Sequence, residues 1–396
     1  MLTIKIIFWI LIFIVYYAYL GYGIVLYFLI RLKRFFKKST DVPDFNTEFP
    51  EVTLFITAYN EKDFIFSKQK NNSSLDYPRE KLKIIWVTDG SDDGSEEILK
   101  QYKDVIVLHE DERKGKINAM NRGIQHVNSP IVVFSDANTL LGKNSLLEIV
   151  RLFCNPKVGC VSGEKRILKK ENDSAVGAGE GIYWRYESKL KQWDAELYSV
   201  VGAAGELFAM RTELYQPVEP DTLLDDFIIS LRIAMLGYII QYSPEAYAME
   251  MSSANVREEM KRKIRIAAGG IQSVIRLYPL LNVFRYGVLS FQYISHRVLR
   301  WTLAPLSLPF IFIMNLLLAN NTGIFAFTFY SVIFWTQILF YATALIGWYL
   351  ENKQLRVKAL FIPYYFCIMN LSIYLGVKRY FSNQQSVNWV RAMRGE

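Results

Sequence analysis

The fold is decided by a run of β-branched residues that ends in a turn of small and acidic ones: residues 83–95 read KIIWVTDGSDDGS. Such short apolar runs, closed by Gly and Asp, are typical of buried β-strands. Three similar runs lie nearby in the chain, at residues 52–57, 105–108 and 131–134. Helix-like stretches alternate with them, at residues 61–72, 95–101 and 116–126. This alternation predicts an α/β domain with a mostly parallel sheet and helices on both faces.

The polar residues that follow these strands are candidates for a ligand site, because α/β sheets bind ligands at the carboxyl ends of their strands. After the second run, Gly90 and Gly94 allow a sharp turn and a close approach of the backbone to a ligand. Asp89 would then accept hydrogen bonds from a base or a ribose. The alternative is an ordinary Asp/Gly turn that caps the helix beginning at Ser95.

A basic segment, Arg113-Lys114-Gly115-Lys116, opens the helix predicted at residues 116–126. Cations and free backbone N–H groups at the start of a helix suit a phosphate. The segment is no Walker A loop, because Ile117 stands where that loop requires Ser or Thr. A solvated basic loop is the alternative interpretation.

Asp136 and Asn138 end the fourth strand-like run, with one residue between them. Two such oxygen side chains can share a hard cation, and Mg²⁺ or Mn²⁺ typically takes one or two protein carboxylates besides phosphate oxygens. We therefore expect Asp136 and Asn138 to be metal ligands. The alternative is a plain turn at the end of a strand.

Two further pairs of charged residues lie on predicted helices. Asp225 and Asp226 precede a helix at residues 228–236, where they either cap it or supply a general base close to a substrate hydroxyl. Arg262 and Arg265 are three residues apart and therefore share a helix face. They either offset the charge of a departing diphosphate or form a basic band at a membrane surface.

Long uncharged runs indicate a membrane protein built around a domain of ordinary polarity. The chain has 396 residues, of which 52% are hydrophobic and 21% charged, and this composition excludes a disordered chain. Residues 6–30, 301–350 and 359–377 contain no Asp, Glu, Lys or Arg, and about 20 apolar residues suffice to span a bilayer. Residues 320–323, Asn-Asn-Thr-Gly, would divide the second run into two spans.

Charge and cysteine content restrict the partners and the compartment. The formal net charge of +8 favours anionic partners such as membrane lipid or phosphates, and we expect no nucleic-acid partner. Three cysteines are too few for a disulfide framework or a cysteine-based zinc site, which suits a reduced, cytosolic domain. The sequence indicates no oligomeric state.

The positions of Lys and Arg predict the orientation in the membrane. Five basic residues directly follow the first apolar run: Arg31, Lys33, Arg34, Lys37 and Lys38. The positive-inside rule places them, and the domain that follows, in the cytoplasm. Three spans in the C-terminal part would then put the tail outside, although it is basic, with Lys378, Arg379, Arg391 and Arg394. Either the tail is an exception or one segment is re-entrant.

We expect three parts along the chain. A membrane anchor occupies residues 1–38, the α/β domain with a leading linker occupies 39–276, and a membrane region of about three spans occupies 277–396. The last part begins with an amphipathic stretch, residues 277–300, that mixes aromatic residues with arginine. Such a stretch suits an interfacial helix in the plane of the lipid headgroups.

Taken in order, these motifs resemble those of membrane-bound family 2 glycosyltransferases, the group of cellulose, hyaluronan and poly-N-acetylglucosamine synthases. The similarity covers roughly residues 50–300. It is carried by Thr57-Ala58-Tyr59-Asn60-Glu61, Asp89-Gly90-Ser91, Arg113 with Gly115-Lys116, Asp136-Ala137-Asn138, Val161-Ser162-Gly163-Glu164, residues 202–207 and Asp225-Asp226.

The resemblance implies a GT-A-type, Rossmann-like domain on the cytoplasmic side of a bacterial plasma membrane. It would use Mg²⁺ or Mn²⁺ to move a sugar, with inversion, from a nucleotide sugar such as a UDP-sugar to a glycan or lipid-linked acceptor in polysaccharide synthesis. Asp226 would be the catalytic base, assisted by Asp225 and Arg265. The donor site would comprise Thr57, Tyr59, Glu61, Asp89, Arg113, Lys116 and Asp136. The acceptor side would comprise Gly205, Glu206, Arg262 and Ile266.

Two departures from the family pattern keep alternatives open. Asn138 replaces the second metal-site Asp and brings no charge. Arg262, Arg265 and Ile266 stand where processive synthases have Gln-x-x-Arg-Trp, so the Trp that floors the acceptor site is missing. One alternative is a non-processive transferase that adds one sugar to a polyprenyl-phosphate lipid. The other is an inactive, transferase-like membrane scaffold or transport component.

Overall fold

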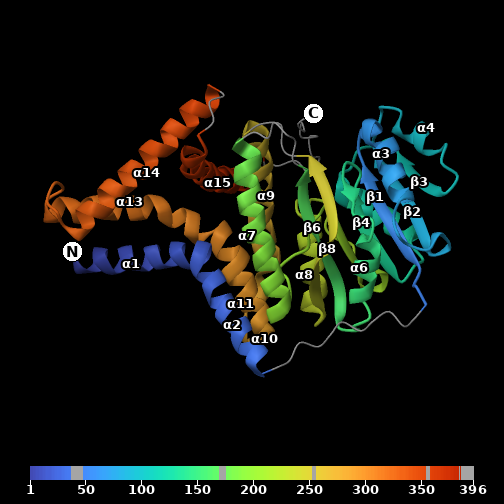
Figure 1. Ribbon diagram of the computed structural model, residues 1–396, viewed down its shortest axis with the longest axis horizontal. Coiled ribbons are helices and arrows are strands. Elements are labelled where there is room, and N and C mark those ends of the chain that lie inside the picture. The colour runs from blue at the N-terminus through green and yellow to red at the C-terminus, as the bar shows by residue number, and fades with distance from the viewer. Residues whose placement is uncertain (37–47, 169–174, 252–255, 354–356, 383, 385–396) are drawn as a thin grey trace.

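The computed structural model describes residues 1–36, 48–168, 175–251, 256–353, 357–382 and 384. The linker predicted at the start of the α/β domain therefore lies largely outside the described residues, as does most of the basic C-terminal tail. The described parts form a sheet-containing domain and a group of long helices, with a layer of further helices between them (Figure 1).

An eight-stranded sheet forms the centre of the domain. Its strands are β1 (Val52–Ala58), β2 (Leu82–Asp89), β3 (Val105–Glu110), β4 (Ile131–Asp136), β5 (Leu140–Leu141), β6 (Val158–Leu168), β7 (Leu207–Arg211) and β8 (Ile239–Met251). They lie in the order β3-β2-β1-β4-β7-β6-β8-β5. The first four strands pair in parallel, as predicted. The second half is mixed, because β7 is antiparallel to both β4 and β6 and β5 is antiparallel to β8, whereas β6 and β8 are parallel.

Side chains alternate along each strand between two apolar cores, one on each face of the sheet. Leu54, Ile56 and Trp86 belong to the core on one face, and Phe55 and Val87 belong to the core on the other. The first core is covered by α3 (Lys62–Ser73) and α6 (Ser145–Leu152), and the second by α5 (Lys116–Gly123) and α8 (Asp225–Met235). Helices on both faces confirm the α/β prediction.

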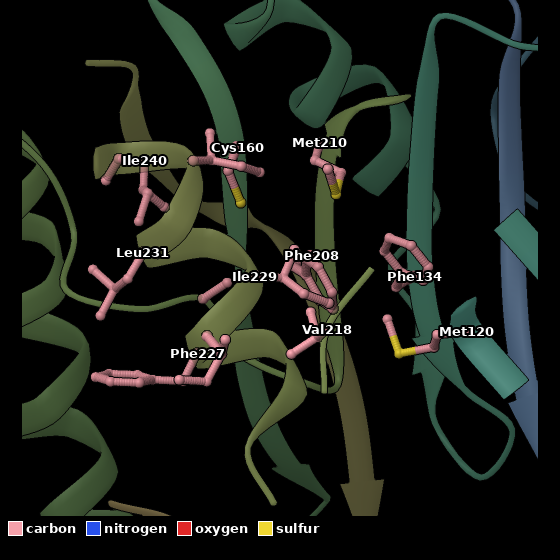
Figure 2. Close-up of a cluster of buried hydrophobic side chains, with 14 of the residues drawn as sticks. Met120, Phe134, Cys160, Phe208, Met210, Val218, Phe227, Ile229, Leu231 and Ile240 are labelled. Atoms are coloured by element: carbon pink, nitrogen blue, oxygen red, sulfur yellow. The ribbon is translucent and has the colours of Figure 1, made fainter. Parts of the chain in front are cut away.

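Figure 2 shows part of the second core. Phe208 lies between Phe134 on one side and Ile229 on the other (Figure 2), and the rings of Phe134 and Phe208 stack with centroids 4.8 Å apart. This packing fixes α8 against the centre of the sheet, where β4 pairs with β7. The first turn of α8 therefore has a defined position relative to the carboxyl end of β4.

Four helical segments are long and apolar enough to cross a membrane by length and composition, within the described part of the chain: Leu2–Phe36, Leu303–Thr322, Phe329–Asn352 and Ala359–Phe381. The first consists of α1 (Leu2–Tyr16), a π-helical segment η1 (Tyr17–Gly21) and α2 (Tyr22–Phe36). The others are α13 (Leu303–Thr322), α14 (Phe329–Asn352) and α15 (Lys358–Phe381). The predicted turn between two spans agrees with the end of α13.

The stretch at residues 277–300 is not the single continuous helix that we expected, and its position at the lipid headgroups stays a prediction. It consists of η5 (Tyr278–Leu281), α10 (Val283–Tyr286), α11 (Val288–Tyr293), η6 (Ile294–Val298) and the start of α12 (Leu299–Trp301). The side chain of Asn282 accepts hydrogen bonds from the backbone N–H groups of Phe284 and Arg285 and so starts a new helix. Gly287, with φ 53°, ends that helix after one turn.

α15 lies along α9 (Val256–Arg276), and no other pair of described helices makes more extensive contact. Near its start, Phe361 and Tyr364 pack with Val256 and Met260 of α9. Three turns further on, a Cβ on Gly376 would lie 2.5 Å from that of Ala267. In Figure 1, α1 and α13 run side by side, whereas α15 lies against α9 and α7 (Ala175–Leu197). α15 therefore belongs to the layer between the sheet and the other apolar helices.

Candidate active site

The carboxyl ends of β1, β2 and β4 meet at one edge of the sheet, because these strands pair in parallel and in register. Thr57 at the end of β1 lies opposite Asp136 at the end of β4. Asp89 ends β2, and Glu61 begins the turn into α3. All of these but Asp136 are at least nine-tenths buried. The structure therefore gathers the predicted donor-site residues of three strands.

Asp89 fixes the shape of the basic loop. Its two carboxylate oxygens accept hydrogen bonds from the backbone N–H groups of Lys114 (3.0 Å) and Gly115 (2.7 Å). Gly90, at φ 67°, packs so closely that a Cβ there would lie 2.6 Å from Cβ of Arg113. The turn after β2 and the segment at 113–116 thus form one unit. A role of Asp89 in nucleoside binding stays a prediction.

Arg113 and Tyr59 form a stacked pair beside this turn. The guanidinium carbon of Arg113 lies 3.6 Å from the centroid of the Tyr59 ring, a close cation–π contact. Both side chains are partly exposed. A planar ring next to a guanidinium offers a stacking surface and a positive charge together, which suits the base and the phosphates of a nucleotide.

Lys116 joins the β4 turn to the first turn of α8. Its ammonium nitrogen lies 2.7 Å from Oδ1 of Asp136 and 3.6 Å from Oδ2 of Asp225. Burial alone would lower the pKa of Lys116, but these two carboxylates outweigh it and raise that pKa, so the side chain stays charged. Oδ2 of Asp225 is buried and has no hydrogen-bond partner among the described residues. Apart from the ion pair with Lys116, this oxygen can therefore accept a hydrogen bond or bind a cation.

Asp226 has the properties of a general base. Burial and the adjacent Asp225 carboxylate raise the pKa of Asp226 from 3.8 to about 7, although Lys116 pulls it down. A carboxylate with a pKa near the working pH is well suited to accept and release a proton. A Cβ placed on Gly205 would lie only 3.3 Å from Oδ2 of Asp226, so the acceptor-side loop leaves space over this carboxylate.

Arg265 of α9 faces the same group of carboxylates. Burial lowers the pKa of its guanidinium, and Asp225, Asp136 and Asp226 partly offset that effect. Its Nε is buried and has no hydrogen-bond partner within the described ranges. A partly buried guanidinium whose Nε makes no hydrogen bond among the described residues suits an anionic ligand such as a diphosphate.

The remaining acceptor-side residues lie in a separate ion network. Lys165 of β6 lies 2.5 Å from Glu206 and also contacts Glu250 of β8. Arg262 pairs with Glu259 one turn earlier on α9, at 3.1 Å. Arg262 is thus held by Glu259 and, at 3.9 Å, by Glu250 of β8, whereas Arg265 is directed to the carboxylates. Ile266 is half-buried on α9, next to Arg265.

Sequence reasoning missed Lys68, a completely buried lysine of α3. Its ammonium donates hydrogen bonds to Oγ of Ser135 and to the carbonyl oxygen of Thr139, both at 2.7 Å. Burial lowers the pKa of Lys68 to about 7, against the attraction of Asp136. The lysine therefore holds the turn that carries Asp136 from beneath. The available signal was its spacing of three residues from the apolar Ile65, which placed it on the inner face of the helix.

The charges at this edge fit a divalent cation. Three carboxylates, those of Asp136, Asp225 and Asp226, share the site with two cations, Lys116 and Arg265. The excess of carboxylate and the unused oxygen of Asp225 suit a hard metal ion. No group of three or more His, Cys, Asp or Glu side chains in the described residues forms a complete metal site. The remaining ligands would have to come from Asn138, from water or from a substrate.

A partly buried carboxylate with a raised pKa and two cations lie together at one edge of a mixed, GT-A-type sheet. These groups suit an enzyme that transfers a group from an activated, phosphorylated donor. Comparison with known proteins specifies the class. The family described as "Glycosyltransferase like family 2" matches residues 50–269, more than half of the chain. The protein belongs to glycosyltransferase family 2, and the predicted enzyme class and fold are confirmed.

Two curated relatives are bacterial synthases of the same name. The poly-β-1,6-N-acetyl-D-glucosamine synthase of Staphylococcus aureus (strain MSSA476) is 29% identical over 245 residues, which are 59% of this chain and 58% of that protein. The synthase of the same name from Staphylococcus epidermidis is 25% identical over 358 residues, 87% of this chain and 85% of that protein. In the first alignment, the chain spans little more than half the length of its relative.

A solved structure shares the fold over nearly the whole chain. The mannosyltransferase PcManGT from Pyrobaculum calidifontis, in complex with GDP-Man and Mn²⁺, superposes with a TM-score of 0.68. The match covers 96% of this chain and 100% of that chain, at 22% identity. At this identity the likeness concerns the fold, including the apolar helices on one side of the sheet.

Proposed function

We propose that this protein transfers a sugar, with inversion, from a nucleotide sugar to a hydroxyl of a glycan or lipid-linked acceptor. The observation that carries this proposal is Asp226, whose pKa is raised to about 7 beside Arg265 and Lys116. A base and two cations in one site match the needs of a displacement in which a proton is lost and a diphosphate leaves. The relatedness to poly-N-acetylglucosamine synthases supports a role in polysaccharide synthesis.

In the proposed mechanism, Asp226 accepts the proton of the acceptor hydroxyl. The acceptor oxygen forms a bond to the anomeric carbon, and the bond from that carbon to the diphosphate oxygen breaks on the opposite face. A single displacement converts an α-linked donor to a β-linked product. Lys116 and Arg265 stabilise the negative charge that develops on the diphosphate. Asp225 positions Lys116 through its carboxylate.

Asp136 would hold Mg²⁺ or Mn²⁺, with Asn138 beside it and Oδ2 of Asp225, which makes no hydrogen bond among the described residues, as a further ligand. A bound metal would neutralise diphosphate charge and orient the phosphates. The Mn²⁺ in the related mannosyltransferase structure supports this assignment. On the donor side, the Arg113–Tyr59 pair would stack on the base. Thr57, Glu61 and Asp89 would line the remainder of the nucleotide site.

The proposed setting is a bacterial plasma membrane, with the sheet domain in the cytoplasm. We keep the proposed division of the chain into an anchor at residues 1–38, a catalytic domain at 39–276 and a membrane region at 277–396. The basic residues that follow the first apolar run support this orientation. An inactive scaffold is the weaker proposal, because a scaffold has no need of a partly buried carboxylate with a raised pKa.

The experiment that tests this proposal uses the full-length protein in lipid nanodiscs. A panel of radiolabelled UDP- and GDP-sugars is incubated with Mn²⁺, and the products are separated by size and by extraction into organic solvent. We expect one nucleotide sugar to label a lipid or glycan product. Failure of every nucleotide sugar to react, by transfer or by hydrolysis, would support the scaffold instead.

A second candidate, addition of a single sugar to a lipid, is favoured by Ile266. Stacking of a flat aromatic ring on a sugar face holds a growing chain for the next addition. Ile266 offers no such face at the place where processive synthases have Trp. Products that are short and soluble in organic solvent would favour this candidate, and long polymer would favour a processive synthase.

A further inference from the structure

A cavity of about 1430 Å³ lies among the apolar helices, away from the active site. Its walls come from the first half of α13, the second half of α14, the middle of α15 and the first residues of α9. α13 begins after Trp301, which packs on Gly270 of α9. The cavity therefore lies in the halves of α13 and α14 nearest the catalytic domain, and the first turns of α9 form part of its wall.

Most of the cavity wall is apolar. Leu308, Phe312, Leu345, Trp348 and Leu371 contribute to it. Two of the polar side chains in the wall already have partners within the protein. Asn370 accepts a hydrogen bond from the hydroxyl of Tyr19, and the hydroxyl of Tyr374 donates to the carbonyl oxygen of Pro305. The inner wall thus presents little unsatisfied polarity, and the volume exceeds the range of about 300–1,000 Å³ that is typical for compact ligands.

Charged residues line only one end of the cavity. This end is lined by Arg257, in the first turn of α9, and by Glu351 and Asn352, at the end of α14. Arg257 is exposed, and the start of a helix adds partial positive charge. The opposite end is formed by Phe312 and Tyr341, whose rings meet edge to face at 5.7 Å. The cavity is therefore amphipathic along its length.

We propose that this cavity binds the hydrocarbon chain of the acceptor lipid, and that Arg257 binds the phosphate of its headgroup. The inference rests on the proposed function, since it names the acceptor of that reaction. The apolar wall suits a long chain taken from the adjoining leaflet. Arg257 suits the phosphate, and Glu351 suits a hydroxyl of a phosphate-linked sugar.

The position of Arg257 relative to the active site supports an acceptor rather than a structural lipid. Arg257 and Arg265 lie on the same helix, eight residues apart, which corresponds to about 12 Å along the axis. A headgroup bound at Arg257 therefore needs to extend by only about the length of a disaccharide to reach the carboxylates near Arg265. One helix connects the proposed lipid site with the site of transfer.

The test uses photo-crosslinking to the full-length protein in nanodiscs. The probe is a diazirine-bearing polyprenyl-phosphate sugar, and a diazirine phosphatidylcholine of similar chain length serves as the neutral comparison. We expect the anionic probe to label peptides that contain residues 341–348 and 366–371, and Arg257→Glu to reduce this labelling at least tenfold. Equal labelling by both probes would overturn the proposal.

Filling the cavity distinguishes specific binding from general lipid contact. Ala344 is buried in the wall, and Ala342 on the same helix is exposed, so Ala344→Trp and Ala342→Trp form a matched pair. Ala344→Trp should reduce both labelling and transfer to the lipid at least tenfold, while hydrolysis of the nucleotide sugar is unchanged. Ala342→Trp should change none of the three. Labelling and transfer within twofold of wild type for Ala344→Trp would overturn the proposal.

Cys367 gives a second way to fill the cavity if Ala344→Trp does not fold. Cys367 lines the cavity, Cys160 is buried and Cys154 is exposed. In a Cys154→Ser background, a bulky apolar maleimide on Cys367 of the folded protein should block lipid labelling. The same reagent on Cys154 in a Cys367→Ser background should not. If the lipid probe labels the cavity but the protein transfers no sugar, the proposed function is contradicted and the lipid site is not. If modification of Cys367 leaves lipid labelling unchanged, the proposed lipid site is contradicted.

Discussion

At the scale of single residues, the proposed reaction depends on the environment of one carboxylate. Asp226→Asn keeps the size of the side chain but cannot accept the acceptor proton. We expect transfer to fall by about 10²–10⁴-fold, the range for loss of general base catalysis, with donor affinity within about threefold. Asp221→Asn, an exposed residue of the preceding loop, is the control. Transfer within tenfold of wild type would remove Asp226 from the mechanism and direct attention to Asp225.

The pH dependence of transfer follows from the same residue. Only the ionised form of Asp226 is a base, so activity should rise with pH and level off above about 7, the raised pKa. The pKa of this carboxyl is about 7 in the folded protein and 3.8 in the unfolded chain, so the folded protein binds the proton more tightly. The group therefore lowers the free energy of unfolding as pH rises from 3.8 to about 7. Asp226→Asn should therefore raise the melting temperature at pH 8 and leave it unchanged near pH 4. A transfer rate that does not rise with pH up to about 7 would contradict this role.

Lys68 provides a prediction about positioning rather than chemistry. Lys68→Met preserves the length of the side chain but removes the hydrogen bonds to Ser135 and Thr139 beneath the turn of Asp136. We expect KM for the donor, and the Mn²⁺ concentration for half-maximal rate, to rise about tenfold while kcat changes less than threefold. Lys70→Met, an exposed lysine of the same helix, is the control. A fall in kcat with unchanged KM would indicate that Lys68 acts on the chemical step instead.

At the scale of elements, local patterns predicted the parallel half of the sheet well. β1 to β4 are short runs rich in β-branched residues, and helical stretches alternate with them along the chain. The antiparallel β7 depends on pairing with β4 across more than 70 residues, which no local pattern encodes. The break-up of residues 277–300 was visible in Asn282 and Gly287, but the aromatic and basic residues around them favoured one amphipathic helix.

The sequence predicted which residues gather at the candidate site but not their contacts. Asp89, Lys116, Asp136 and Asp226 lie at one edge of the sheet, as expected, and their roles stay predictions. Their partners depend on tertiary structure, however. Arg262 and Arg265, for example, were expected to act together on one helix face. Arg262 instead pairs with Glu259, whereas Arg265 is directed to the carboxylates.

The contact of α15 with α9 predicts the side of the membrane on which the C-terminal tail lies. α9 carries Lys261, Arg262, Lys263 and Arg265 within five residues, and each such charge costs about 2.5–3.5 kcal/mol or more at the centre of a bilayer. A helix that lies along α9 therefore belongs to the membrane surface or a re-entrant segment. Of the two alternatives left open by the sequence, this favours the re-entrant one, with the tail in the cytoplasm.

Cysteine accessibility in intact cells measures this topology. In a Cys367→Ser background, Ser382→Cys at the end of α15 should resist a membrane-impermeant maleimide until the cells are permeabilised, as should the native Cys154 of the catalytic domain. Asn321→Cys, between α13 and α14, should react without permeabilisation. Reaction of Ser382→Cys in intact cells would mean that α15 crosses the membrane.

At the scale of the whole molecule, α9 belongs to two environments at once. Its first turn contacts the cavity and α15, and Arg265 two turns later faces the carboxylates of the active site. A stiff helix shared by two sites is a natural route for allosteric coupling. If an occupied cavity shifts α9 so that Arg265 binds the donor more tightly, linkage requires the donor to tighten lipid binding by the same factor. The enzyme would then bind its donor strongly only when an acceptor is present, and little activated sugar would be lost to water.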